Sequence, residues 1–506
     1  MQALYRTIIV LIYFTMSFGN NCLAQKINEE EHRLQIHFSP KANWINDPNG
    51  MVFLNGTYHL FFQYHPHSTI WGPMHWGHAT SKDMLHWNEE AIALYPDSLG
   101  TIFSGSAVVD KNNTSGFGKG GKVPMVAIFT HHNAKLESTG LNQYQSIAYS
   151  LDEGKSWTKY PGNPVLPNPG VSDFRDPKVS WYEAGKKWIM TLATKDRITF
   201  YSSPDLKKWT KESEFGKELG AHGGVWECPD LISFDDNGKK VWVLLVSINP
   251  GGPNKGSATQ YFVGDFNGSN FVAAHTDTRW MDYGPDNYAG VTFSNLGDKQ
   301  ILIGWMNNWL YANQVPTKTW RGAMTLPRTL ALKHVGDKIL LTSSVVPGIT
   351  ALQSKPVLAQ NFEVNKKLDI ANKTGKISLP CRINLELIKT ADISLTIANN
   401  LGEELVIGYD KKTNQYYIDR TKSGKVDFQK EFSGRSFAPR LATTAQQNMS
   451  VFIDVSSVEL FADNGLSVMT ALYFPNKTYD KITIQTPASL RIKKLEYVQL
   501  KPTVKK

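Results

Sequence analysis

The sequence predicts an all-β protein in which a five-bladed β-propeller is followed by a C-terminal β-sandwich. The chain has 506 residues, which is too long for one ordinary hydrophobic core. Between residues 40 and 345, short apolar segments alternate with tight turns and show almost no helical periodicity. A turn motif that ends in tryptophan recurs three times within this region. Beyond it, shorter alternating segments predict a second β domain.

The first predicted hairpin illustrates the strand pattern. Residues 51–54 and 57–64 are rich in apolar and aromatic side chains and flank the pair Asn55 and Gly56. Asn-Gly readily adopts the positive φ angles of a type I′ turn, which joins two antiparallel strands. Similar hairpins follow further along the chain, so the region is predicted to be a succession of antiparallel strands.

The recurring turn predicts how these strands are grouped. A Ser, a following Asp and a closing Trp span residues 81–87, 150–157 and 203–209. The three tryptophans, Trp87, Trp157 and Trp209, lie 70 and 52 positions apart. This spacing is typical of propeller blades of about four strands, and roughly 300 residues at that spacing give about five blades.

The character of the sequence changes near residue 345. Residues 346–356 contain two prolines and a glycine and are predicted to be a linker. It separates a propeller domain at 25–345 from a sandwich domain at 357–506. Eight alternating segments predict the strands of the second domain: 383–387, 391–398, 404–409, 415–419, 449–455, 457–462, 467–473 and 481–486.

The first 24 residues are typical of a signal peptide. Arg6 precedes an apolar run at residues 8–16, and small side chains precede Gln25. The run is shorter than the roughly 20 apolar residues that a membrane span needs, and no later segment approaches that length. We expect cleavage after Ala24 and a secreted, periplasmic or cell-surface protein. Lipid attachment at Cys22 is the alternative.

Composition limits the partners of the protein. The net charge of +9 comes from 54 Lys and Arg against 45 Asp and Glu, scattered through turns. No motif of a nucleic-acid-binding fold accompanies these residues, so we interpret them as solvated surface charge and expect no nucleic-acid partner. The 14 Trp, 20 Tyr and 24 Phe are more than packing requires, which is a hint of sugar-stacking faces.

Cysteine and histidine usage predicts neither a disulfide framework nor a metal centre. Beyond the signal peptide only Cys228 and Cys381 remain, in separate predicted domains. Four histidines lie close together, at His65, His67, His75 and His78. They lack the cysteine, carboxylate or helical spacing that usually accompanies zinc, so we interpret them as hydrogen-bonding side chains. We therefore expect no metal and no cofactor.

Three acidic clusters of the first domain are candidates for chemistry. Residues 44–50 contain Asp47, residues 174–177 contain Asp176, and residues 226–230 contain Glu227. Each acid stands one or two positions before a proline, which stiffens the chain and helps to fix the direction of the carboxyl group. The first strands of successive propeller blades converge on one central funnel. The three acids are therefore predicted to meet there.

Two carboxyl groups at one sugar are what glycoside hydrolysis requires. Glu227 lies between Trp226 and Cys228 in the sequence, and an apolar neighbourhood favours the protonated acid that gives its proton to the leaving oxygen. Asp47 has asparagines on either side, whose donors favour the ionised form of a nucleophile.

The third acid is predicted to hold the sugar. Arg175 stands beside Asp176 and favours an ionised carboxylate that accepts hydrogen bonds from sugar hydroxyls. Taken singly, each cluster is equally compatible with ordinary turn chemistry, because Asp-Pro and Asn-Gly are common in turns. The joint occurrence of all three favours catalysis.

Together, these motifs resemble the signature of glycoside hydrolase family 32, the invertase, inulinase and levanase group. The matching motifs, in order, are residues 44–50, 103–106, 175–177 and 227–230. Further matches are Gln63, Trp71, 282–286, 304–306 and 320–328, so the resemblance covers nearly the whole mature chain. One departure is Asn287, where many family members carry Phe, which leaves substrate preference open.

The resemblance implies a retaining double displacement. Asp47 would be the nucleophile, Glu227 the acid and then the base, and Asp176 the stabiliser of the transition state. It also implies a pocket for the terminal fructose, lined by Trp44, Asn46, Gln63, Trp71, Phe103, Ser104, Arg175 and Trp305.

The expected activity is that of a secreted, exo-acting β-fructosidase whose partners are fructan or sucrose as substrate. Alternatives within the enzymes are an endo-acting levanase or inulinase and a fructosyltransferase, which share the same acids. A catalytically silent fructan-binding protein is the alternative from another class.

Overall fold

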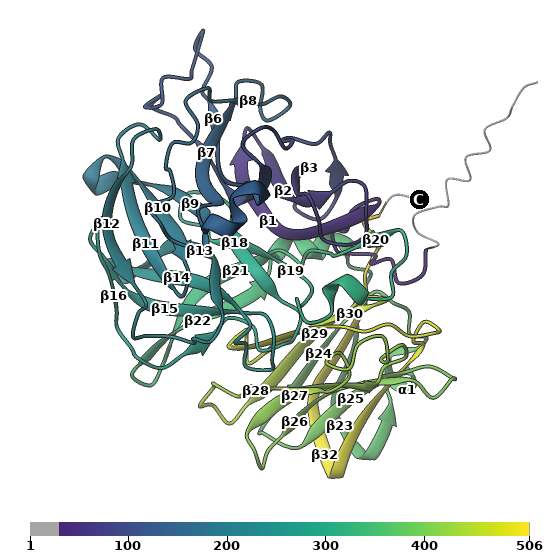
Figure 1. Ribbon diagram of the computed structural model, residues 1–506. Helices are drawn as coiled ribbons and strands as arrows, with labels where there is room; N and C mark the ends of the chain where they lie inside the picture. Colours follow the sequence, from purple (N-terminus) through teal and green to yellow (C-terminus); the bar gives the residue numbers. More distant parts are fainter. Residues whose placement is uncertain (1–29, 505–506) are drawn as a thin grey trace, which may run out of the picture.

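The computed structural model describes residues 30–504 of the chain, so the predicted signal peptide and Cys22 lie outside the described residues. Strands form two domains in succession (Figure 1), and short 3-10 turns occur at Ala134–Thr139 (η2), Glu183–Gly185 (η3) and Ala312–Gln314 (η4). The prediction of an all-β propeller followed by a β-sandwich is confirmed.

The first domain is a propeller of five antiparallel blades. Blade I contains β1 (Asn43–Leu54), β2 (Thr57–His65), β3 (His75–Ser81) and β4 (Trp87–Glu89). Blade II contains β5 (Thr101–Val109), β6 (Met125–His132), β7 (Gln143–Ser150) and β8 (Thr158–Lys159). Blade III contains β9 (Phe174–Tyr182), β10 (Lys187–Thr194), β11 (Arg197–Ser203) and β12 (Thr210–Phe215).

The remaining two blades complete the ring. Blade IV contains β13 (Val225–Asp236), β14 (Lys239–Asn249), β15 (Ala258–Phe266), β16 (Phe271–Ala273) and the short β17 (Arg279–Trp280). Blade V contains β18 (Tyr288–Thr292), β19 (Ile301–Trp305), β21 (Arg328–Val335) and β22 (Lys338–Val345). The first strands β1, β5, β9, β13 and β18 pack against one another around the centre. Strand β20 (Trp320–Arg321) pairs in parallel with β1 and joins the last part of the propeller to the first blade.

The recurring turn occupies the same place in three blades. In blades I to III it joins the third strand to the fourth, and its Ser hydroxyl donates to its Asp carboxylate. The fourth residue of each turn, Met84, Glu153 and Leu206, has a φ of 65°, 61° and 65°. The same backbone conformation in three turns explains why the motif repeats. The predicted Asn55-Gly56 hairpin is also confirmed, with φ of 47° and 76°.

The second domain is built from ten strands. They are β23 (Val357–Asp369), β24 (Cys381–Leu387), β25 (Ile393–Ala398), β26 (Glu404–Asp410), β27 (Gln415–Lys422), β28 (Arg435–Pro439), β29 (Gln447–Ile453), β30 (Ser457–Ala462), β31 (Ser467–Leu472) and β32 (Lys481–Gln499). One end of the long β32 pairs with β25 and the other with β24, so β32 takes part in both layers of the sandwich. Strand β23 pairs with β32 along both parts.

The sequence predicts most of this domain but not β23 and β28. Strand β23 lies at an edge and is largely exposed, so it lacks the alternation of apolar and polar residues that marks a half-buried strand. The predicted linker contains η5 (Pro347–Leu352), whose Ile349 and Leu352 are buried beside Phe452 and Phe461 of the sandwich. A single helical turn, α1 (Ala371–Thr374), follows β23.

Buried charges join the two domains. Arg328 of β21 donates to Asp282 of the propeller at 2.8 Å and to Glu459 of β30. His37, from the segment before β1, lies 2.8 Å from both Glu459 and Asp454. Although burial opposes its charge, these two carboxylates raise the pKa of His37 to about 9. Removing one partner from such a buried network is costly, which fixes the sandwich against the propeller.

Candidate active site

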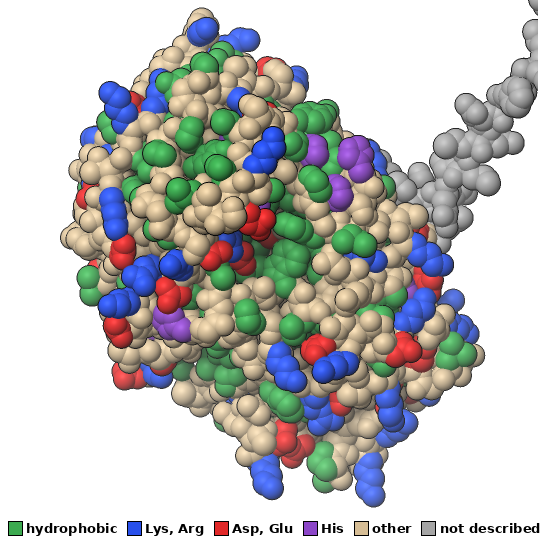
Figure 2. Space-filling model, viewed as in Figure 1, with side chains coloured by type: hydrophobic (Ala, Val, Ile, Leu, Met, Phe, Trp, Pro, Cys, Tyr) green, Lys and Arg blue, Asp and Glu red, His purple; other side chains and the backbone are tan. Residues whose placement is uncertain are grey.

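The candidate active site is a cavity of about 380 Å³ at one end of the propeller axis. Figure 2 shows acidic side chains gathered in a hollow of the upper domain, bordered by hydrophobic ones. The structure brings all three predicted acids into this one cavity. Its lining consists of Asn46, Asp47, Gln63, Trp71, Phe103, Ser104, His132, Glu137, Gln143, Arg175, Asp176, Glu227, Asn249 and Trp309.

Local backbone irregularity aims the acids inward. In every blade the register between the first two strands shifts. The shift encloses Asp47 in blade I, Phe103 and Ser104 in blade II, Asp176 in blade III and Cys228 in blade IV, and it follows Tyr288 in blade V. A β-bulge bends its strand and redirects a side chain. Proline lacks the N–H that a ladder needs, so the prolines after Asp47, Asp176 and Cys228 favour a bulge at these positions.

Two of these bulges hold residues in an uncommon conformation. Asp176 has a φ of 64° and Cys228 a φ of 44°, and neither residue is glycine. Non-glycine residues in the left-handed region cost free energy and cluster at functional sites. The strain therefore supports a role for these two positions beyond packing.

Both carboxylate oxygens of Asp47 are held in place. Asn46 Nδ2 donates to Oδ1 at 2.9 Å, and the Ser104 hydroxyl donates to Oδ2 at 2.6 Å. The Cys228 thiol lies 3.4 Å from Oδ2. These donors favour the ionised form, as predicted, but burial and the charge of Glu227 outweigh them and raise the pKa of Asp47. The sequence predicts the donors but not the opposing burial and charge.

Glu227 does not have the apolar surroundings that the sequence predicts. Arg175 donates to its Oε1 from Nε at 3.1 Å and from Nη2 at 3.0 Å, and the buried Tyr288 hydroxyl donates to Oε2. Trp226, its neighbour in the sequence, is buried in a hydrophobic cluster between blades. Successive side chains of a strand point to opposite faces, so an apolar neighbour in the sequence is not an apolar neighbour in space.

Asp176 also departs from the prediction. Its Oδ2 accepts a hydrogen bond from the backbone N–H of Cys228 at 3.0 Å, but the Arg175 guanidinium is bonded to Glu227 and Asp173 instead. Burial, together with the charges of Glu227 and Asp47, raises the pKa of Asp176 to about 7 against the opposing effect of Arg175. With a pKa of about 7, Asp176 gains or loses its proton near neutral pH.

Six of the eight side chains predicted for the fructose pocket line the cavity, and two do not. Asn46, Gln63, Trp71, Phe103, Ser104 and Arg175 line the cavity. Trp44 and Trp305, however, are both 0 % exposed and do not reach it. They lie behind its wall, where Trp44 donates to Asn46 Oδ1 at 2.8 Å and Trp305 packs on Trp309 with ring centroids 4.9 Å apart. Trp309 is the aromatic side chain that lines the cavity there.

Sequence reasoning missed six residues of the site: His132, Glu137, Gln143, Asn249, Tyr288 and Trp309. All six lie at strand ends, in a 3-10 turn or in a loop, where no periodicity marks a position. Tyr288 follows Asn287, the one departure noted in the sequence, and nothing in the sequence shows that its hydroxyl is buried.

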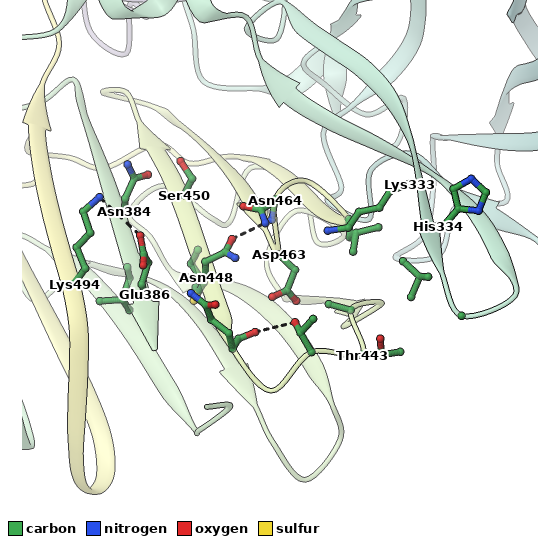
Figure 3. A pocket seen from close by; sticks show the side chains of 18 residues that line it. Lys333, His334, Asn384, Glu386, Thr443, Asn448, Ser450, Asp463, Asn464 and Lys494 are labelled. Carbon is green, nitrogen blue, oxygen red and sulfur yellow. Dashed lines mark hydrogen bonds and ion pairs between the residues drawn. The ribbon is translucent and has the colours of Figure 1, made fainter. Parts of the chain in front are cut away.

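Another hollow of the protein lacks this chemistry. A cavity of about 510 Å³ lies between the β21–β22 hairpin and the sandwich (Figure 3). Its acids are neutralised by cations, since Glu386 lies 3.8 Å from Lys494 and Asp463 lies 2.9 Å from Arg440. It therefore offers no pair of free carboxyl groups for acid and base work.

The predicted histidine cluster forms hydrogen bonds. His65 and His75 bond to backbone carbonyls, and His78 lies 3.1 Å from His59. Within residues 30–504, no three His, Cys, Asp or Glu side chains are grouped so that they could hold a metal ion. Cys228 and Cys381 are buried and unpaired.

Asp176→Asn is expected to change how the stability of the protein depends on pH. Above pH 7 the parent protein carries a buried charge at Asp176, whereas below pH 4 the carboxyl group is neutral in the folded and unfolded states alike. The stability that its proton contributes is therefore lost as pH rises from 4 to 7. Thermal unfolding should show the variant more stable than the parent at pH 8 and equal to it at pH 4. The exposed Asp265→Asn is the control, and an identical shift at both pH values would contradict this account.

A five-bladed propeller whose inner strands bring three carboxyl groups into one sugar-sized cavity defines a glycoside hydrolase. The chain belongs to glycosyl hydrolases family 32: the N-terminal domain of the family matches residues 37–343, and the C-terminal domain matches residues 349–499. The resemblance seen in the sequence is thereby confirmed.

Individual relatives agree with this assignment. A levanase of Bacillus subtilis is 43 % identical over 94 % of this chain and 71 % of its own length. Invertase 1 of Saccharomyces cerevisiae is 36 % identical over 92 % of this chain and 93 % of its own. The crystal structure of an exo-inulinase from Aspergillus awamori matches with a TM-score of 0.85 at 36 % identity, and covers 94 % of this chain and 99 % of that one.

Proposed function

We propose that this glycosidase is an exo-acting β-fructosidase that releases fructose from levan, inulin or sucrose with retention of configuration. The observation that carries the proposal is the placement of Asp47, Asp176 and Glu227 in one small cavity. The names of the relatives, levanase, exo-inulinase and invertase, support fructans and sucrose as the substrate class.

In the first step, Asp47 attacks the anomeric carbon of the terminal fructosyl unit. Because hydrogen bonds already hold both of its oxygens, Asp47 loses little conformational freedom on reaction and meets the substrate already oriented. The bond from the anomeric carbon to the leaving oxygen breaks while Glu227 gives that oxygen its proton. The products are a fructosyl ester on Asp47, a Glu227 carboxylate and the shortened sugar.

In the second step, the Glu227 carboxylate takes a proton from water, whose oxygen attacks the same carbon and displaces Asp47. Arg175 and Tyr288 donate to the two oxygens of Glu227 and hold it in position for both steps. Asp176 accepts hydrogen bonds from fructose hydroxyls, which strengthen as charge develops on the ring.

The shape of the cavity supports exo action. Its volume of about 380 Å³ is near the lower end of the range for ligand pockets, which suits the end of a chain rather than its middle. Trp44 and Trp305 are buried behind the wall of the cavity, so the cavity is closed on that side. An internal segment of a fructan would need a cleft that is open at two ends.

Product analysis on sucrose, inulin and levan in parallel tests the proposal. Fructose as the only early product from both polymers would support exo hydrolysis, and the ratio of rates would give the linkage preference. Short oligosaccharides from levan or inulin would instead indicate endo action. Longer oligosaccharides formed at high sucrose would indicate fructosyl transfer, and no turnover of any substrate would overturn the enzymatic proposal.

We further propose that the protein is exported by a signal peptide at residues 1–24, with cleavage after Ala24 and lipid attachment at Cys22 as the alternative. The word extracellular in the name of an Aspergillus niger exo-inulinase supports export. Between residues 30 and 504 the structure contains no helix with the length and hydrophobicity to cross a membrane. Mass spectrometry of the mature N-terminus distinguishes cleavage before Gln25 from lipidation of Cys22.

A further inference from the structure

A buried trio of side chains joins the sandwich to a propeller loop that reaches the active site. Arg420 of β27 donates from Nη1 to Asp286 Oδ2 at 2.6 Å and from Nη2 to the Tyr311 hydroxyl at 2.8 Å. The Tyr311 hydroxyl in turn donates to Asp286 Oδ1 at 2.6 Å, so the three side chains close a ring of hydrogen bonds. The mechanism above uses none of these residues.

The sandwich holds this trio in one geometry. The Leu472 N–H of β31 donates to Asp286 Oδ2 at 2.8 Å, and the Arg420 guanidinium lies over the Phe432 ring at 3.8 Å. Asp286, Tyr311 and Arg420 are all buried. Because a buried charge that loses its partner is costly, the Tyr311 hydroxyl has little freedom to move relative to the sandwich.

Tyr311 belongs to the loop that carries Trp309. Residues 306–311 lie between β19 and η4 and belong to no strand. The Tyr311 N–H donates to the Asn308 carbonyl at 3.1 Å, and the turn that this bond closes contains Trp309. Trp309 is half-buried and lines the cavity, with its ring against the buried Trp305. The side chain anchored by the sandwich is therefore two residues from an aromatic wall of the active site.

We propose that Arg420, acting through Tyr311, is a positioning residue that sets the place of Trp309 in the cavity wall. The sandwich thereby shapes the active site, although none of its described residues lines the cavity. The effect on catalysis rests on the proposed β-fructosidase activity, because Trp309 then packs on the apolar face of a sugar ring. Arg420 itself touches neither the sugar nor the reacting atoms.

Tyr311→Phe tests the link with a small change, because it removes only the hydroxyl. We expect KM for sucrose to rise about 3- to 10-fold, the effect of weakening one aromatic contact, while kcat stays within about twofold. In a Trp309→Ala background the same change should raise KM no further, because its effect passes through Trp309. Initial rates of fructose release over a range of sucrose concentrations measure both constants.

The sandwich contains a matched control. The Tyr416 hydroxyl donates to Asp463 at 2.8 Å, and Arg440 lies 2.9 Å from the same carboxylate, so these residues form a buried trio of the same three types. All three belong to the sandwich domain. Tyr416→Phe should therefore keep the parental KM. A similar rise of KM in Tyr416→Phe would show general loosening of the protein and overturn the link to Trp309.

A spectroscopic measurement follows Trp309 without relying on turnover. In protein labelled with 5-fluorotryptophan, the fluorine resonance of Trp309 is the one that Trp309→Phe removes. Tyr311→Phe and Arg420→Met should shift or broaden this resonance, whereas Arg420→Lys keeps a cation beside Asp286 and should change it less. Circular dichroism shows whether each variant is folded. If Arg420→Met does not fold, Tyr311→Phe decides the question.

Two results with folded Tyr311→Phe would overturn the role of Arg420: a Trp309 resonance and a KM that both match the parent, or a rise of KM that is undiminished in the Trp309→Ala background. Failure of the proposed function is a different result, because the unmodified protein would then release no fructose. The fluorine spectrum would still report whether Arg420 and Tyr311 position Trp309.

Discussion

Asp47→Asn is expected to lower kcat about 10⁴-fold or more, because it removes the nucleophile of the double displacement. Asparagine has nearly the same shape, and its amide oxygen can still accept from Asn46 or Ser104. Burial makes the charge of Asp47 costly, so the uncharged variant should be at least as stable as the parent. The rate of fructose release from sucrose at saturating substrate measures the effect.

The control for this variant is a surface aspartate in the same propeller. Asp265 is 67 % exposed, and its one ion pair among the described residues, with Lys239, is a long surface contact of 3.8 Å. Asp265→Asn should therefore keep full activity. Circular dichroism and sucrose binding by calorimetry should show that Asp47→Asn is folded and still binds substrate. A folded variant that keeps a tenth of the parental kcat would exclude Asp47 as the nucleophile.

Glu227→Gln is expected to lower kcat/KM for sucrose about 10²- to 10⁴-fold, the contribution typical of a positioned general acid. Glutamine cannot give a proton to the leaving sugar, although it can still accept from Tyr288. A fructoside with a good leaving group, such as a nitrophenyl fructoside, does not need this proton. The first step with that substrate should therefore be nearly unimpaired.

A pre-steady-state experiment separates the two roles of Glu227. With the nitrophenyl fructoside, Glu227→Gln should release one equivalent of nitrophenol rapidly and then stall, because no base activates water to cleave the ester on Asp47. Azide, which attacks without losing a proton, should restore turnover. An equal loss on sucrose and on the nitrophenyl fructoside, without a burst, would show that Glu227 acts in another way.

Proline placement explains how much of the site the sequence predicts. Asp47, Asp176 and Cys228 each precede a proline, and this local chemistry produces the bulges that turn side chains toward the centre. The three acids could therefore be chosen from the sequence. The repeated turn is equally local, since a Ser and an Asp two positions apart close it, and it predicts the blades.

The environment of each acid was not predictable in the same way. Glu227 has Trp226 and Cys228 as neighbours in the sequence, yet its partners in space are Arg175 and Tyr288 from two other blades. The alternation of a strand sends adjacent side chains to opposite faces. Protonation depends on burial and on charges brought together from distant segments, which no single motif contains.

The sequence by itself determined the fold class, the repeat of the blades and the identity of the three acids, because strand periodicity, turn chemistry and proline are properties of neighbouring residues. Only the tertiary structure decided that Trp309 and not Trp305 borders the cavity, that Arg175 pairs with Glu227, and that Glu137 and Asn249 face the same opening. These arrangements arise where separate blades meet around one axis. Their geometry is set by packing between strands far apart in the chain.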